Sequence, residues 1–168
     1  MSKIIVADTG PLIAFARIDR IDLLAKLFGA IIIPQAVADE CLIEKHRPGA
    51  IVIQQAISEK VVQIYSNPPP TELADLTDIL DIGEAAAIKL AFINKCPLII
   101  DKKLGRAVAT KLQIKIIGSA GILLLAKQKK VIPLIKPVLL KLKNESYYLA
   151  DHLINEVLVR AGEGDSLS

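Results

Sequence analysis

The tripeptide Asp8-Thr9-Gly10, close to the start of the chain, is the first candidate for catalytic chemistry. The same tripeptide carries the catalytic carboxylate of aspartic proteases, which need two such carboxylates sharing a proton in an all-β setting. Here it occurs once, and Pro11 and apolar residues at helical spacing follow it. An aspartic protease is therefore disfavoured, and Asp8 calls for another explanation.

Two aspartates directly follow short apolar runs that predict β-strands. Asp8 follows residues 4–7 (IIVA), and Asp101 follows residues 97–100 (PLII). Ligands of an open parallel sheet bind outside the carboxyl ends of its strands. We therefore expect both carboxylates at the same edge of one sheet.

Two glutamates lie within reach of that edge. Glu40 follows a second predicted strand at 30–34, and Glu84 lies in the first turn of a helix that begins near Asp81. Four converging carboxylates would raise one another's pKa values unless a divalent cation neutralised them, and hard oxygen ligands favour Mg²⁺ or Mn²⁺. We predict such a metal site. Without metal, replacing Glu84 or Asp101 by its amide should stabilise the protein.

Simpler roles stay open for the same residues. Asp8 and Thr9 can cap a helix, and the spacing of Asp81 and Glu84 fits a capping box. The sequence leaves these roles open beside metal binding.

Basic residues follow Asp101 directly. Lys102, Lys103 and Arg106 can form a solvated helix face or contact a phosphate group, and the net charge of +3 permits a polyanionic partner without requiring one.

The order of elements predicts an α/β fold. Apolar runs suited to strands alternate with helical patterns, at 4–7, 30–34, 61–65, 97–100 and 114–117. Such alternation implies a central parallel sheet with helices on both faces, a three-layer α/β/α sandwich. Within it we expect Asp19 to cap the second helix, Gly29 to end it and residues 66–72 (SNPPPTE) to form a loop.

The length of 168 residues predicts a single domain at 1–162, followed by a flexible tail at 163–168. The apolar fraction of 52% is high, which suggests that a homodimer or partner interface covers part of the surface. No apolar run approaches the roughly 20 residues of a membrane span. The N-terminus lacks a secretory pattern. We expect a cytoplasmic protein.

Four segments, in this order, resemble the PIN-domain proteins and in particular the VapC-type toxin ribonucleases of toxin–antitoxin systems: VADTGPLIAFARI, IIIPQAVADE, GEAAAIKLA and LIIDKKLGRAVATKLQIKIIGSAGILLLAK. The resemblance runs to about residue 160. It implies a metal-dependent ribonuclease with acidic site residues at Asp8, Glu40, Glu84 and Asp101, a small hydroxyl residue at Thr9, and a protein antitoxin as partner.

The chain departs from this pattern at one position. Related proteins often carry two consecutive acids after the later strand, whereas Lys102 follows Asp101 here. This difference keeps an alternative open, in which the chain is a catalytically degenerate PIN-like domain that acts as an RNA-binding or protein-interaction module.

Overall fold

The computed structural model describes residues 3–164. Its five strands form one parallel sheet in the order β3-β2-β1-β4-β5, and each lies within one of the five predicted apolar runs. Their bounds are β1 (Ile4–Ala7), β2 (Ala30–Pro34), β3 (Val62–Tyr65), β4 (Leu98–Ile99) and β5 (Ile116–Ile117). Because β1 pairs with both β2 and β4, it is the central strand.

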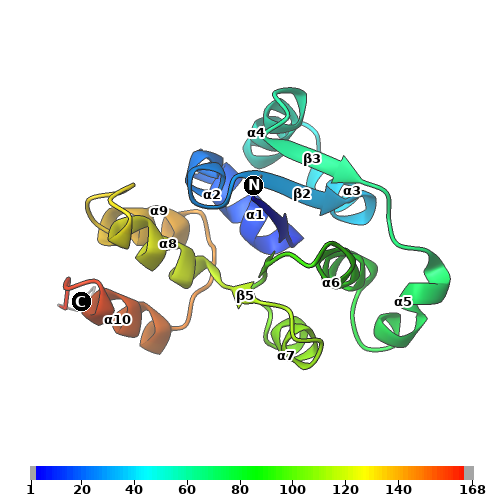
Figure 1. Ribbon diagram of the computed structural model, residues 1–168. Coiled ribbons are helices and arrows are strands. Elements are labelled where there is room, and N and C mark those ends of the chain that lie inside the picture. Colours follow the sequence, from blue (N-terminus) through cyan, green and yellow to red (C-terminus); the bar gives the residue numbers. More distant parts are fainter. Residues whose placement is uncertain (1–2, 165–168) are drawn as a thin grey trace.

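Helices cover both faces of the sheet (Figure 1). They are α1 (Thr9–Arg17), α2 (Ile21–Phe28), α3 (Gln35–Leu42), α4 (Pro48–Ser58), α5 (Pro70–Thr77), α6 (Ile82–Asn94), α7 (Lys103–Lys111), α8 (Ser119–Gln128), α9 (Lys136–Asn144) and α10 (Asp151–Arg160). The chain moves from β1 to β3 in one direction across the sheet and from β4 to β5 in the other. Right-handed crossovers therefore place α1 and α2 on one face and α6 and α7 on the other. The α/β three-layer sandwich is confirmed.

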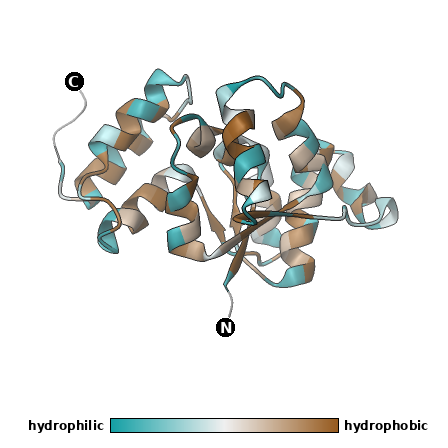
Figure 2. Cartoon of the chain, turned by 90° about the horizontal axis from the view of Figure 1, so that it is seen from above, coloured by the Kyte–Doolittle hydropathy of each residue, from teal (hydrophilic) through white to brown (hydrophobic). Residues whose placement is uncertain are grey.

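Strands of this composition form a sheet because both of their faces are buried. The side chains of Ile5, Ile31, Ile32, Leu98 and Ile99 are fully buried, and Figure 2 shows the hydrophobic colour concentrated in the central strands. β-Branched and apolar residues fit such a sheet, where layers of helices exclude water from both sides. The rigid centre of the sheet fixes the position of every residue that follows a strand.

Two local predictions were wrong. The predicted loop at 66–72 ends early, because α5 starts at Pro70, where a proline suits the first helical turn, and buries Leu73 and Leu76 against the core. Asp19 does not cap α2, since the residue at that position is Arg20 and Asp19 itself has a positive φ of 55°. Gly29 does end α2, with φ 85°.

The C-terminal end of the described chain is attached to the fold. Glu163 accepts hydrogen bonds from the Lys127 ammonium at 2.9 Å and from the backbone N–H groups of Ile135 and Lys136 at 2.9 and 3.1 Å. Of the predicted tail at 163–168, residues 165–168 lie outside the described residues. Across residues 3–164, none of the helices is both long enough and apolar enough to cross a membrane.

Candidate functional site

Asp8 lies at the carboxyl end of the central strand. Its backbone N–H donates to the carbonyl oxygen of Ile99 at 3.0 Å, which joins the end of β1 to the end of β4. Only 2% of Asp8 is exposed, so its carboxyl group lies in the interior, at the N-terminus of α1. Within residues 3–164, its carboxylate accepts no capping hydrogen bond from a backbone N–H group of the first turn of α1. A capping role alone therefore does not account for it.

The environment of Asp8 disfavours the ionised carboxylate. Burial, the largest effect, raises the pKa of Asp8 to about 7, and the negative charges of Glu84 and Asp81 add to the rise. The backbone N–H of Thr9 and the Lys102 ammonium act in the opposite direction. A buried carboxylate with a raised pKa and acidic neighbours is typical of functional sites.

Glu84 is the second buried carboxylate of the site, and 7% of the residue is exposed. Its Oε1 accepts a hydrogen bond from the Lys102 ammonium at 2.8 Å, and Lys102 also donates to Asp81 Oδ2 at 3.3 Å. Burial raises the pKa of Glu84, and the neighbouring Asp81 adds to the rise while Lys102 opposes it. The capping interpretation holds for Asp81, because its Oδ1 accepts from the backbone N–H of Glu84 at 2.8 Å. The Glu84 side chain itself is turned to Lys102.

Glycines leave room for two of the acidic side chains. A Cβ atom at Gly83 would collide with the carboxylate of Glu40, which therefore lies against the first turn of α6. A Cβ atom at Gly105 would lie 3.2 Å from Glu84 Oε2 and 2.6 Å from the Ile100 side chain. A larger residue at Gly83 would push the Glu40 carboxylate away, and one at Gly105 would collide first with Ile100 and come close to Glu84.

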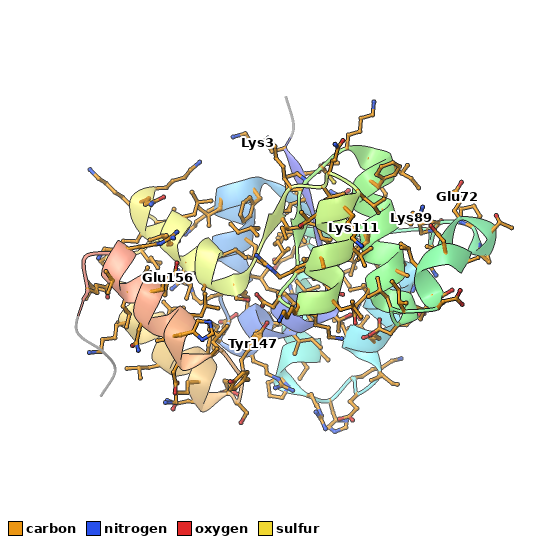
Figure 3. All side chains as sticks on the ribbon, turned by 90° about the horizontal axis from the view of Figure 1, so that it is seen from below. Lys3, Glu72, Lys89, Lys111, Tyr147 and Glu156 are labelled. Carbon is orange, nitrogen blue, oxygen red and sulfur yellow. The ribbon has the colours of Figure 1, made fainter. Side chains whose placement is uncertain are left out.

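Asp101 follows β4 at the same edge, but its oxygens have partners of their own. Ser119 donates to it twice, from its backbone N–H at 2.7 Å and from its hydroxyl at 2.5 Å, and the Tyr147 hydroxyl donates to Oδ2 as well. Tyr147 comes from the segment after α9, and Figure 3 shows it between the C-terminal helices and the N-terminal part of the chain. Burial, then the charge of Asp101, raises the pKa of Tyr147 above its usual range.

The structure thus brings Asp8 and Glu84 together, places Glu40 against Gly83 with its side chain exposed, and binds Asp101 to other groups. Sequence reasoning missed three residues of this site: Asp81, Ser119 and Tyr147. The place of Ser119 two residues after the last strand was an available signal. Tyr147 gave none, because its contact depends on how the C-terminal helices pack.

The predicted basic residues have different environments. Lys103 is exposed, whereas Arg106 donates from Nη1 to the carbonyl oxygen of Ile100 at 2.9 Å. A cavity of about 410 Å³ opens beside Asp101 and Arg106, with Ile117, Leu124 and Val157 among its apolar walls. The cavity joins a cationic side chain to an apolar surface next to the acidic edge.

The donor atoms of the site suit a hard divalent cation at Asp8 and Glu84. Both carboxylates are buried, and in the described part of the chain the hydroxyl oxygen of Thr9, beside Asp8, is buried without a hydrogen-bond partner. Unpaired buried oxygens of this kind are suitable ligands for Mg²⁺ or Mn²⁺. Among residues 3–164, however, no three acidic, histidine or cysteine side chains stand close enough together to hold a metal ion.

The hydrogen bonds of Asp101 reverse the expectation that its neutralisation stabilises the metal-free protein. Asp101→Asn should lower the free energy of unfolding by about 1–3 kcal/mol. One of the two accepting oxygens becomes an NH₂ group, which cannot accept the hydrogen bonds that Ser119 and Tyr147 donate. Urea unfolding in EDTA measures the change, with Asp78→Asn at an exposed carboxylate as control. An Asp101→Asn protein that is as stable as the wild type, or more stable, would contradict this prediction and would indicate that repulsion between the carboxylates dominates.

The raised pKa of Asp8 predicts a pH dependence of stability. Between an unfolded value near 3.8 and a folded value of about 7, the native state keeps a proton that the unfolded state has lost. The free energy of unfolding should therefore fall as pH rises through this window, by at most about 1.4 kcal/mol per pH unit, and level off above it. Urea midpoints of wild type and Asp8→Asn in EDTA isolate this contribution. A difference between them that stays constant from pH 4 to 8 would contradict it.

Comparison with known proteins places this geometry in a family. A family model that describes a PIN domain matches residues 4–163. Among solved structures, a domain of a functionally unknown protein from Methanocaldococcus jannaschii DSM 2661 is similar, with 22% sequence identity and a TM-score of 0.49 over 70% of this chain and 91% of that chain. The comparison with curated proteins finds no match. The chain belongs to the PIN-domain family.

Proposed function

We propose that the chain is a metal-dependent ribonuclease that hydrolyses RNA phosphodiester bonds, as the toxin of a toxin–antitoxin pair. The observation that carries the proposal is the buried Asp8 carboxylate, with its pKa raised to about 7, beside Glu84 at the carboxyl edge of the sheet. PIN domains are typically nucleases, which gives this acidic edge its expected chemistry.

Asp8 and Glu84 are the residues that would hold the metal ion. Regular elements hold the backbone of both residues, since Asp8 directly follows the central strand β1 and Glu84 lies in the first turn of α6. When bound there, Mg²⁺ or Mn²⁺ would lower the pKa of a water molecule and would offset negative charge on the phosphate group. Because burial raises the pKa of Asp8 to about 7, a fraction of the Asp8 carboxyl groups keeps its proton at neutral pH, and a cation beside the side chain would favour the ionised form.

Other residues of the edge have positioning roles in this proposal. Asp101 binds Ser119 and Tyr147 and so holds the ends of β4 and α8 and the C-terminal segment together. Arg106, beside the cavity of about 410 Å³, offers further N–H donors to a substrate phosphate, and the apolar walls of the cavity suit part of a nucleotide. Glu40 is the remaining acid, and its exposed carboxylate at Gly83 is accessible to solvent and substrate.

The contact between Lys102 and Glu84 favours a second function, that of a PIN-like domain without catalysis. The Lys102 ammonium already neutralises Glu84 at 2.8 Å, as expected for a PIN-like domain that has lost catalysis and acts as an RNA-binding or protein-interaction module. The two functions differ in whether RNA is cut when metal is present.

Incubation of the purified protein with a pool of structured RNAs, in Mn²⁺ and in EDTA, distinguishes them. We expect cleavage in Mn²⁺ only, and we expect Asp8→Asn to lower the rate by on the order of 100-fold or more, since it removes a charge that acts directly at the reaction centre. Asp78→Asn, at an exposed position, serves as control. Cleavage that persists in EDTA, or a folded Asp8→Asn protein within a few fold of wild type, would count against the mechanism.

The partners in this proposal are a second copy of the chain and a small antitoxin. Large apolar side chains are exposed around the acidic edge, with Ile43 82%, Ile82 58% and Leu104 54% exposed. Exposed apolar groups that cluster near a site mark contact surfaces. Light scattering should give the mass of a dimer across a wide concentration range. A monomer throughout that range would contradict the homodimer.

A further inference from the structure

Lys102 is bound to Glu84, one of the two proposed metal ligands, and to the neighbouring Asp81. Its ammonium lies 2.8 Å from Glu84 Oε1 and 3.3 Å from Asp81 Oδ2, so two acids of one helix end share a single lysine. Ammonium groups and metal ions compete for the same carboxylate oxygens. The other oxygen of Glu84, Oε2, faces Gly105 at the start of α7.

The backbone of Lys102 is fixed, whereas its side chain has room to move. Lys102 occupies the residue before α7, and its carbonyl oxygen accepts from the backbone N–H of Arg106 at 2.9 Å. The side chain is 58% exposed. Its ammonium is carried on a flexible four-carbon stem, so it can leave Glu84 without any change in the sheet.

The charges at the site balance with one added ion. Asp8, Asp81 and Glu84 contribute three negative charges when ionised, and Lys102 contributes one positive charge. One divalent cation neutralises the remainder, whereas two would leave an excess of positive charge in a partly buried site. Repulsion between cations at such distances is large where water is scarce.

We propose that Lys102 is a tethered cation which competes with a divalent metal ion for Glu84 and limits the site to one ion. The inference rests on the proposed metal site at Asp8 and Glu84. In the metal-free chain the lysine compensates the carboxylates. When an ion binds, the ammonium leaves Glu84 but stays beside Asp81 at the edge of the sheet, so its charge still counts, and there it lies where the substrate phosphate of the proposed reaction would lie.

A purely structural ion pair is the competing explanation. Such a pair would join α6 to the start of α7, and its loss would lower stability to the same extent with and without metal. Competition predicts instead that loss of Lys102 makes metal binding tighter. Removal of a positive charge a few ångströms from the ion strengthens the attraction of the carboxylates for it.

Calorimetric titration of the full chain with MnCl₂ tests the proposal on wild type, Lys102→Met and Lys102→Gln. The Met variant keeps much of the apolar stem and removes the charge. The Gln variant also keeps a hydrogen-bond donor for Glu84, and it serves if Lys102→Met does not fold. Lys103→Met is the matched control, since Lys103 is the exposed neighbouring lysine and, within residues 3–164, makes no side-chain hydrogen bond or ion pair.

We expect both Lys102 variants to bind one Mn²⁺ about tenfold more tightly than wild type, a conservative figure for a partly exposed charge, and Lys103→Met to bind like wild type. Urea midpoints should show the Lys102 variants to be less stable than wild type in EDTA and to gain more stability from saturating Mn²⁺. Unchanged or weaker Mn²⁺ binding by both variants, or two ions bound by wild type, would overturn the proposal. Tighter binding by the variants with no RNA cleavage by any form would support it while refuting the ribonuclease function.

Discussion

The site depends on a carboxylate buried at the end of the central strand. Asp8 has no freedom to reach water, because its backbone is hydrogen-bonded to β4 on one side and α1 begins at the next residue. A carboxylate in such a place must take up a proton or be matched by a positive charge. The neighbouring acids make this requirement stronger, so the edge of the sheet is built to attract a cation.

The remaining structure supplies the room and the counter-charge that this edge needs. Gly83 and Gly105 allow two glutamate side chains to lie against helix starts, where a Cβ atom would collide with Glu40 and crowd Glu84. The N-termini of α1, α6 and α7 all lie at the carboxyl ends of strands or face them, and their partial positive charge favours anionic groups there. Lys102 adds a full positive charge on a flexible stem. The two glycines thus provide room for the acidic side chains, and the helix N-termini and Lys102 provide positive charge that offsets their negative charge.

Features that depend on the local sequence pattern, such as the strands, were predicted correctly. Features that depend on tertiary packing, such as α5 and the contact of Tyr147, were missed. Five strands were found because short β-branched runs between helical patterns admit few other interpretations, and strand ends predicted the positions of Asp8 and Asp101. The helix α5 was missed because three consecutive prolines indicate a loop, whereas the last of them starts a helix that two buried leucines hold in place. The role of Tyr147 was missed, since nothing near it in sequence shows that it reaches Asp101.

Asp8 and Asp101 follow neighbouring strands, yet their surroundings give them different chemistry. Ser119 and Tyr147 satisfy the oxygens of Asp101, which fixes its orientation and leaves little capacity for another ligand. Asp8 lacks such donors from side chains of the described residues and keeps its capacity for a cation. Strand register alone would make the two aspartates equivalent. The distinction arises from where α8 begins and from how the C-terminal segment folds back. Residues far from the sheet therefore determine that the oxygens of Asp101 are hydrogen-bonded whereas those of Asp8 receive no hydrogen bond from a described side chain.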